Sequence, residues 1–242
     1  MSRRWDPLWF GLAVLSIWQL LHLRVGSEGL ASPAQTLHRI ETLFGSSNFW
    51  SNVASTGQAF ALSILIAVVV GTTIGLVLGL FHEAGDVFDP ILNALSSLPK
   101  ITLYPIILLF FGLGMPARVA FGTIHAIFPL MILTMNGVRT IRPVVRKTAR
   151  SLRLSPVQTI RTVLLPAALP EIFTGLRLGV ALALLGVLVG EMFASDRGIG
   201  FMLMQGVERQ DSATIMGLTV LLFTIAVSGG VALLAIDKRL HG

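Results

Sequence analysis

Long apolar segments constrain the fold of this chain more than any other feature. Six stretches approach the roughly 20 apolar residues that an α-helix needs to cross a bilayer, at about 7–23, 57–81, 98–114, 119–138, 171–194 and 213–236. Only 12% of the residues are charged and the mean hydropathy is +0.81, which is typical of membrane proteins. We therefore predict one all-α, polytopic membrane domain over 1–242 with about six transmembrane helices.

Two of these segments are less regular than the others. The third contains Pro105, which removes a backbone donor and tends to kink a helix. The first has a basic start and a long apolar run, and no cleavage site of small residues follows closely. We expect it to be a retained span rather than a removed signal peptide.

The distribution of Lys and Arg predicts the orientation of the spans. With the N-terminus inside, five of the 18 basic residues fall on the outer side, namely Arg24, Arg39, Arg118, Arg197 and Arg209. The other 13 fall inside, namely Arg3, Arg4, Lys100, Arg139, Arg142, Arg146, Lys147, Arg150, Arg153, Arg161, Arg177, Lys238 and Arg239. Because Lys and Arg collect in cytoplasmic loops, we expect both termini in the cytoplasm. The membrane also accounts for the net charge of +6, so no nucleic-acid partner is expected.

Small residues recur at helical spacing in the second segment, at Gly71, Gly75 and Gly79. Such spacing lets another helix approach closely. The partner is either a helix of the same subunit or one of a second copy.

The longest predicted inner loop, 139–170, is basic where most of the chain is apolar. One helix face is predicted by the spacing of its less polar residues, which are Ile141, Val144, Val145, Thr148, Ala149 and Leu152. Arginines recur on the opposite side, so this first helix is amphipathic and basic.

The same loop carries the start signal of a second helix. Ser155, Pro156 and Gln158 have the order of a capping box, in which each polar side chain satisfies a free amide of the other residue. Pro166 disfavours helix in the residue before it, so we expect this helix to stop near Leu165 and Pro170 to open the next span. By spacing alone, the two helices and their bend at 153–155 fit a protein-docking site and a lipid-facing surface helix equally well.

The loop resembles the EAA loop of ABC importer permeases, in which Glu-Ala-Ala is followed by a glycine and then by Ile-x-Leu-Pro. Its end, VLLP at 163–166, fits this pattern, whereas the Glu-Ala-Ala positions read KTA at 147–149 and the glycine position is Arg153. The resemblance assigns coupling to an ATPase to Lys147, Thr148, Ala149, Arg150, Ser151, Leu152, Arg153, Leu154, Ser155 and Pro166.

The departures from the pattern have physical consequences. A glycine at the bend adopts φ > 0 freely, whereas Arg153 must use an ordinary turn conformation or carry strain. Lys147 in place of glutamate removes a partner for basic groups of the ATPase. Two interpretations stay open: these cations pair with acidic groups of a co-adapted ATPase, or coupling is weaker.

The flanking segments extend the resemblance over nearly the whole chain. Residues 165–203 are similar to the corresponding part of aliphatic sulfonate, taurine and nitrate permeases, LPKITLYPIILLFFGLG at 98–114 to their third span, and SPAQTL at 32–37 to their first outer loop. The resemblance implies the type I ABC importer permease fold and a homodimer in the bacterial inner membrane. It also implies two copies of a cytoplasmic ABC ATPase, and a periplasmic or lipid-anchored substrate-binding protein.

The expected substrate is a small organic or inorganic anion, such as a sulfonate, taurine or nitrate. The alternatives are a permease of the same family for a different small solute, and a stand-alone secondary transporter. The second is disfavoured because the sequence shows no inverted repeat and no charge near the middle of a span.

No catalytic motif is present in the sequence. None of the lysines completes a phosphate-binding loop, so ATP and Mg²⁺ are expected on the partner ATPase and no cofactor in this chain. The five histidines are far apart and there is no cysteine, so no metal site is expected. We therefore expect a non-catalytic permease.

Polar residues within the predicted spans are candidates for the translocation path, because they are costly in a bilayer. They are Thr123, His125, Asn136 and Glu191. His125 fits either a contact with a passing anion or a bond to a neighbouring helix. Glu191 is expected to reach the outer water, at the mouth of the path. The stretch 195–212 is expected to form a short outer helix that either contacts the binding protein or covers the bundle.

Overall fold

The computed structural model describes residues 6–241, and the side chains of 9–145, 147–149, 151–232 and 234–235. Every regular element in this part of the chain is a helix. The elements are α1 (Asp6–Val25), α2 (Pro33–Phe44), α3 (Ser47–Leu80), α4 (His82–Ser97), η1 (Lys100–Leu103), α5 (Tyr104–Phe111), α6 (Met115–Arg139), α7 (Pro143–Ser151), α8 (Pro156–Thr159), η2 (Ile160–Leu164), α9 (Leu165–Ala194), α10 (Ile199–Glu208) and α11 (Ser212–His241).

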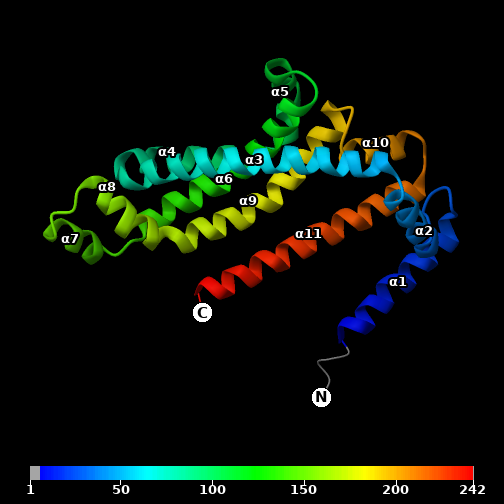
Figure 1. Ribbon diagram of the computed structural model, residues 1–242, viewed down its shortest axis with the longest axis horizontal. Coiled ribbons are helices and arrows are strands. Elements are labelled where there is room, and N and C mark those ends of the chain that lie inside the picture. Colours follow the sequence, from blue (N-terminus) through cyan, green and yellow to red (C-terminus); the bar gives the residue numbers. More distant parts are fainter. Residues whose placement is uncertain (1–5, 242) are drawn as a thin grey trace.

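Three long helices, α3, α6 and α9, run side by side and form the core (Figure 1). Gly71, Gly75 and Gly79 of α3 all lie against α6, and a methyl group added at Gly75 would lie 2.6 Å from the carbonyl oxygen of Met131. Small residues allow this close approach of two backbones. Of the two partners considered for the glycine stripe, packing within one subunit is confirmed.

Length and hydropathy alone identify fewer spans in the structure than the six predicted. Within the described residues, four helices are long and apolar enough to cross a membrane, namely Ser47–Leu80, Met115–Arg139, Pro156–Ala194 and Ser212–Ala232. A fifth span results if α4, η1 and α5 cross as one bent unit, and α1 supplies a shorter apolar helix over Trp9–Val25. The all-α membrane fold is confirmed, whereas the count of six spans stays a prediction.

The third predicted span, 98–114, corresponds to a shorter helical unit over Lys100–Phe111, formed by η1 and α5. α4 precedes this unit, and the chain bends by 89° between the two. Pro105 lies in the first turn of α5, where a missing N–H costs nothing, so it begins a helix rather than kinking one. Figure 1 shows α5 standing out from the bundle.

The predicted stop at Pro166 is also wrong. A helical run extends over Pro156–Ala194, with Pro166 in the first turn of α9 and Pro170 inside it. The π-helix η2 lies just before Pro166, and the Leu165 N–H donates to the Ile160 carbonyl. A π-turn changes the hydrogen-bond register and widens the helix, so the proline ring is accommodated and the helix continues into the span.

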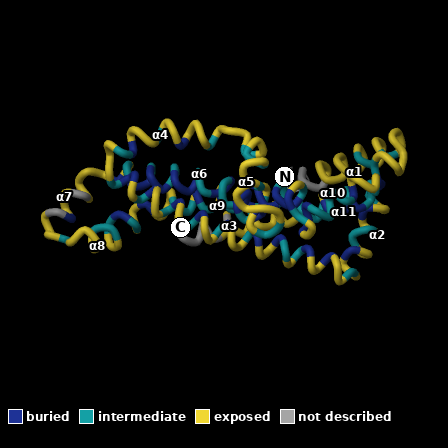
Figure 2. Tube along the Cα trace, turned by 90° about the horizontal axis from the view of Figure 1, so that it is seen from above, coloured by how far each residue is buried: buried dark blue, intermediate teal, exposed yellow. Residues whose placement is uncertain are grey.

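The two ends of the elongated molecule carry different elements. α7 and α8 project at one end, and α2 and α10 lie at the other (Figure 1). Figure 2 shows that the buried residues gather along the core helices, whereas α4, α7 and α8 are largely exposed. The helices that carry the predicted coupling residues, α7 and α8, are therefore at the opposite end of the three-helix core from α10.

Candidate functional site

α7 ends in a tight backbone bend. The Leu152 N–H donates to the Thr148 carbonyl at 3.0 Å and the Leu154 N–H donates to the Ala149 carbonyl at 3.2 Å. Between them Arg153 has φ = 50°. A bond that spans five residues around a left-handed residue is the Schellman motif, where glycine is the usual choice. Of the two conformations considered for Arg153, the structure has the strained one.

The capping box that follows the bend is confirmed. The Ser155 N–H donates to Gln158 Oε1 at 2.9 Å, and the Gln158 N–H donates to Ser155 Oγ at 3.3 Å. The three bend residues 152–154 are thus held between a C-terminal motif on α7 and an N-terminal cap on α8. The two predicted short helices and the bend between them are both present.

The bend presents an apolar side chain within a basic surface. Leu152 is 67% exposed, and Lys147 and Arg153 are exposed beside it in the chain, whereas Ala149 is buried. The side chain of Arg150 lies outside the described residues. The structure brings 147–155 together in one compact tip, and it places Pro166 apart from that tip, beyond η2.

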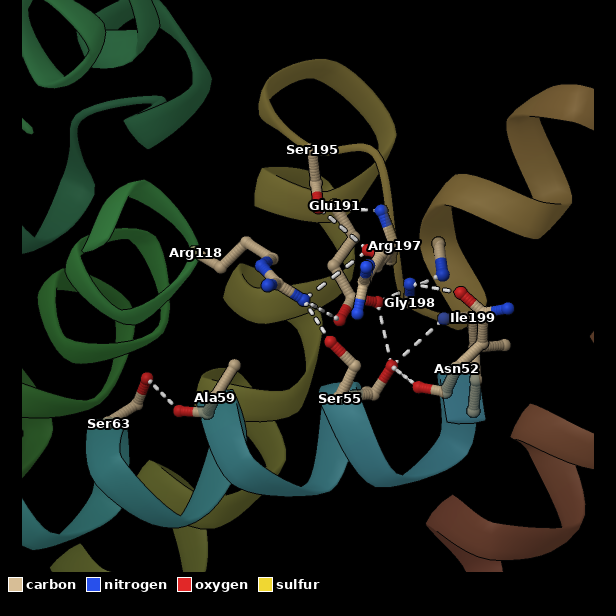
Figure 3. Close-up of polar contacts among 12 residues, drawn as sticks. Asn52, Ser55, Ala59, Ser63, Arg118, Glu191, Ser195, Arg197, Gly198 and Ile199 are labelled. Atoms are coloured by element: carbon tan, nitrogen blue, oxygen red, sulfur yellow. Dashed lines mark hydrogen bonds and ion pairs between the residues drawn. The ribbon is translucent and has the colours of Figure 1, made fainter. Parts of the chain in front are cut away.

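A buried polar network lies toward the opposite end of the core (Figure 3). Arg118 of α6 and Glu191 of α9 are 4% and 0% exposed, with 3.5 Å between Arg118 Nη1 and Glu191 Oε1. Arg118 Nη1 also donates to Ser55 Oγ at 2.7 Å and to the Arg197 carbonyl at 3.3 Å. The network therefore connects α3, α6 and α9 with the loop before α10.

The same network caps the N-terminus of α10 with side chains from other helices. Three backbone amides in sequence, at 198–200, donate to Asn52 Oδ1, Thr56 Oγ1 and Glu191 Oε2 at 2.6, 2.9 and 3.0 Å. Thr56 Oγ1 in turn donates to Glu191 Oε2 at 2.9 Å. The first amides of a helix need such acceptors and its dipole favours an anion there, so this arrangement fixes α10 on the bundle.

Gly198 makes this close contact possible. Its φ of 114° lies in the region that favours glycine, and a methyl group there would overlap the Glu191 carboxylate. A side chain at this position would be strained by the backbone and would displace the carboxylate.

The prediction that Glu191 reaches the outer water is wrong. Its carboxylate is fully buried, and Arg118, the Thr56 hydroxyl and the Gly200 amide surround it in place of water. Sequence reasoning missed Arg118, Asn52, Ser55 and Thr56. A usable signal was present for Arg118, because it and Glu191 carry opposite charges near the same end of two predicted spans. Such charges are expected to pair within the bilayer.

The other path candidates do not form one site. His125 is buried and its Nδ1 lies 2.7 Å from the Phe121 carbonyl of its own helix, which requires a proton on Nδ1. Thr123 Oγ1 lies 3.5 Å from the Ser63 carbonyl of α3, and Asn136 is half-buried near the other end of α6. Glu191, at the outer network, is separate from all three.

Comparison with known proteins agrees with this arrangement of helices. The family model described as "Binding-protein-dependent transport system inner membrane component" matches residues 67–241. The chain belongs to this family. It is therefore an inner-membrane permease component of a binding-protein-dependent transport system, and a multi-pass membrane protein.

Individual relatives support the family assignment over most of the chain. The chain is 28% identical to the taurine transport system permease protein TauC of Escherichia coli (strain K12), over 88% of this chain and 80% of TauC. It is 32% identical to the nitrate import permease protein NrtB of Synechocystis sp. (strain ATCC 27184 / PCC 6803 / Kazusa), over 89% of this chain and 80% of NrtB.

A solved structure supports the fold. A chain from inward-facing conformations of the MetNI methionine ABC transporter superposes with a TM-score of 0.66 at 22% identity, covering 78% of this permease and 94% of that chain. The predicted ABC importer permease fold is thereby confirmed.

Proposed function

We propose that this permease imports a small anion, such as a sulfonate, taurine or nitrate, as a homodimer driven by two copies of a cytoplasmic ABC ATPase. The relatives named for taurine, which carries a sulfonate group, and for nitrate support a substrate with an anionic oxygen-bearing group. ATP and Mg²⁺ bind to the ATPase, and this chain performs no catalytic step. Its part is to form the path and to convert closure of the ATPase pair into movement of its helices.

The bend at 152–154 carries the coupling proposal. Its backbone is fixed on both sides by caps, so Leu152 is presented in one orientation with little loss of entropy on docking. Burial of a leucine side chain contributes about 1.5–3 kcal/mol. Exposed Lys147 and Arg153 add positive charge beside it. The matching surface on the ATPase is an apolar groove with acidic residues at its rim.

The outer end of the molecule is proposed to contact the substrate-binding protein. The C-terminal end of α10 and the turn after it are exposed at Val207, Glu208, Arg209 and Gln210. Arg39 of α2 and Asp211 form an ion pair of 3.1 Å that links the two outer segments. The buried N-terminus of α10 keeps this exposed end in a fixed position.

The proposed orientation has both termini in the cytoplasm. Because the chain has no cysteine, single cysteines report their side directly. Cysteines at His38 and Glu208 should react with a membrane-impermeant thiol reagent in intact cells, whereas those at Glu83 and Thr159 should not. The reverse pattern would contradict the orientation.

The coupling proposal is tested with charge and apolar substitutions in the bend. Leu152→Asp and Arg153→Glu should each lower co-purification of the ATPase by about tenfold or more. Loss of a buried leucine side chain costs about 1.5–3 kcal/mol, and loss of a desolvated charge pair costs about 2–5 kcal/mol. Permease levels in the membrane should stay unchanged, because the bend lies outside the apolar segments. Loss of substrate-stimulated ATP hydrolysis in liposomes should follow loss of assembly.

A matched control separates docking from lipid binding. Arg142→Glu makes the same charge change at an exposed position just before α7. A lipid-facing surface predicts that Arg142→Glu and Arg153→Glu have similar small effects, of about 1 kcal/mol each. Wild-type assembly and stimulation in both the Leu152→Asp and Arg153→Glu variants would reject the docking site.

A further inference from the structure

The break between α4 and α5 is unusual for a membrane protein. The chain turns by 89° there, and Ser97, Leu98 and Pro99 at the break are exposed. Non-helical backbone at membrane depth is tolerated only where it is covered by protein or lines a water-filled cavity. The exposed break must therefore face an aqueous path or a second copy of the chain, and not lipid.

Lys100 lies at this break, about half-way along α6. Its Nζ is 5.7 Å from the centre of the Phe128 ring and donates to the Ser96 carbonyl at 2.7 Å. Phe128 lies about 20 Å along α6 from Met115 and about 17 Å from Arg139, at 1.5 Å per residue. Lys100, which the sequence predicted on the inner side, therefore lies beside the middle of α6.

The other end of α4 fixes this depth independently. Arg139, the last residue of α6, forms an ion pair with Asp86 in the second turn of α4, and Leu92 belongs to the same buried cluster as Met131 and Met135. α4 thus runs along α6 from its inner end to its middle. Lipid phosphates lie at the membrane surface and do not reach this depth.

No carboxylate lies within 4.0 Å of Lys100 Nζ among the side chains that the structure describes. A charged side chain within a bilayer is costly, and it faces a partner charge or a water-filled cavity. The aromatic face of Phe128 stabilises the ammonium group only in part. The charge is therefore available to an anion.

α4 also has a polar face that leads to Lys100. Asp89, Asn93 and Ser97 recur at i, i+4 and i+8, which places them on one side of α4, and Ser97 is the last residue of α4, three positions before Lys100. Asn93 Nδ2 and Ser97 Oγ each donate to a carbonyl one turn earlier, and their oxygens remain free to accept from water. Asp89 lies about 12 Å along α4 from Ser97, at 1.5 Å per residue, so the polar face extends from the break to the middle of α4.

We propose that Lys100 is an anion-binding residue of the translocation path, where its ammonium group contacts one oxygen of the transported anion at the middle of the membrane. This inference rests on the proposed import of a small anion. It assigns the positive charge of the path to the broken span, and not to His125.

The absence of cysteine in the chain allows a direct test. The complete transporter, with its ATPase and binding protein, is reconstituted in liposomes with ATP, and uptake of labelled taurine, methanesulfonate and nitrate is measured. For the anion that the wild type imports, Lys100→Cys and Lys100→Met should lower the maximal rate by about tenfold or more, the loss expected for one charge-assisted hydrogen bond. The KM should stay unchanged, because the binding protein sets it.

Chemical restoration of the charge gives the decisive readout. Treatment of the Lys100→Cys transporter with 2-aminoethyl methanethiosulfonate restores a cation. Uptake should return to within about threefold of the wild type, because the remaining deficit is small compared with the loss expected for one charged hydrogen bond. The 2-sulfonatoethyl reagent adds an anion and should not restore uptake. The treated wild type reports any effect on cysteines of the other subunits. Lys100→Arg should retain uptake, and Arg24→Met, which removes an exposed charge from α1, should have no effect.

The outcomes separate this inference from the proposed function. A wild-type transporter that imports none of the three anions would overturn the substrate class, and the inference with it. If the wild type imports an anion and Lys100→Met imports it equally well, only the inference fails. It fails likewise if the cysteine does not react, if both reagents restore uptake, or if the uncharged variants lose assembly with the ATPase, which indicates a structural role.

Discussion

Removal of one charge from the Arg118–Glu191 pair should destabilise the permease more than removal of both charges. The two side chains are 4% and 0% exposed, so neither charge can turn to water. Glu191→Gln keeps an oxygen that accepts from Thr56 and from the Gly200 amide, but it leaves Arg118 without a counter-charge. Arg118→Met leaves the Glu191 carboxylate buried in the same way.

The structure sets the expected size of this effect. Breaking a buried ion pair from one side costs about 3–5 kcal/mol. Arg118 keeps its bonds to Ser55 and to the Arg197 carbonyl, so we expect about 3 kcal/mol for each single variant, at the lower end of that range. The double variant Arg118→Met/Glu191→Gln leaves no unpaired charge, and the coupling between the two sites should be at least about 2 kcal/mol.

A double-mutant cycle on thermal stability measures this coupling. For a chain of this size about 1 kcal/mol shifts Tm by roughly 2–4 °C, so each single variant of the purified permease should lose about 6–12 °C and the double variant should recover much of that loss. The exposed pair Arg39–Asp211, 40% and 36% exposed, is the matched control and should show coupling of at most about 1 kcal/mol. Additive losses at Arg118 and Glu191 would refute the buried pair.

Three further predictions concern other parts of the molecule. Arg153→Gly should relieve a left-handed conformation that costs about 1–2 kcal/mol in residues other than glycine. The greater freedom of glycine in the unfolded chain offsets about 0.5–1 kcal/mol of this gain. Slower hydrogen exchange of the Leu154 amide would show the stabilisation of the bend, and faster exchange would contradict it. Gly75→Ala should destabilise the contact of α3 and α6 by about 1–3 kcal/mol through overpacking, and an unchanged Tm would refute this. Burial alone would raise the pKa of the Asp211 carboxyl, but hydrogen bonds from Thr214 and a neighbouring arginine outweigh it and lower that pKa. Because the folded pKa is the lower one, the contribution to stability is complete above the usual pKa of 3.8 and is lost as the pH falls through the folded value. The small Tm difference between wild type and Asp211→Asn should therefore be present at about pH 6 and should shrink as the pH falls below 3.8. A difference that does not change with pH would argue against it.

The two short helices α7 and α8 and the bend between them show which features can be predicted from local sequence. Ser155 and Gln158 are three residues apart, and the hydrogen bonds of their capping box form within that distance. The bend at Arg153 likewise depends on amides and carbonyls within one turn of α7. Such features follow from the order of residues alone, and the structure confirms them. The use of this segment to dock an ATPase remains a proposal.

Predictions made from single prolines were wrong where the neighbouring backbone could accommodate the ring or the missing N–H. Pro166 was expected to end a helix, but the π-turn before it changes the hydrogen-bond register and the helix continues. Pro105 was expected to kink a span, but it lies in the first turn of α5, where its missing N–H is harmless. Proline limits the conformations that a backbone can adopt, and packing selects among those that remain.

The sequence alone predicted the apolar segments, the absence of phosphate-binding motifs and the two short helices with the bend between them. Each of these depends on residues within a few turns of one another. Only the tertiary structure decided that Glu191 is buried and that Lys100 lies half-way along α6. Glu191 bonds to Thr56, 135 positions away, and Lys100 lies against Phe128 on another helix. Whether a charge in a membrane protein faces water, a partner charge or a path depends on which helices pack around it. Here the packing of α3, α4, α6 and α9 determines the surroundings of both residues.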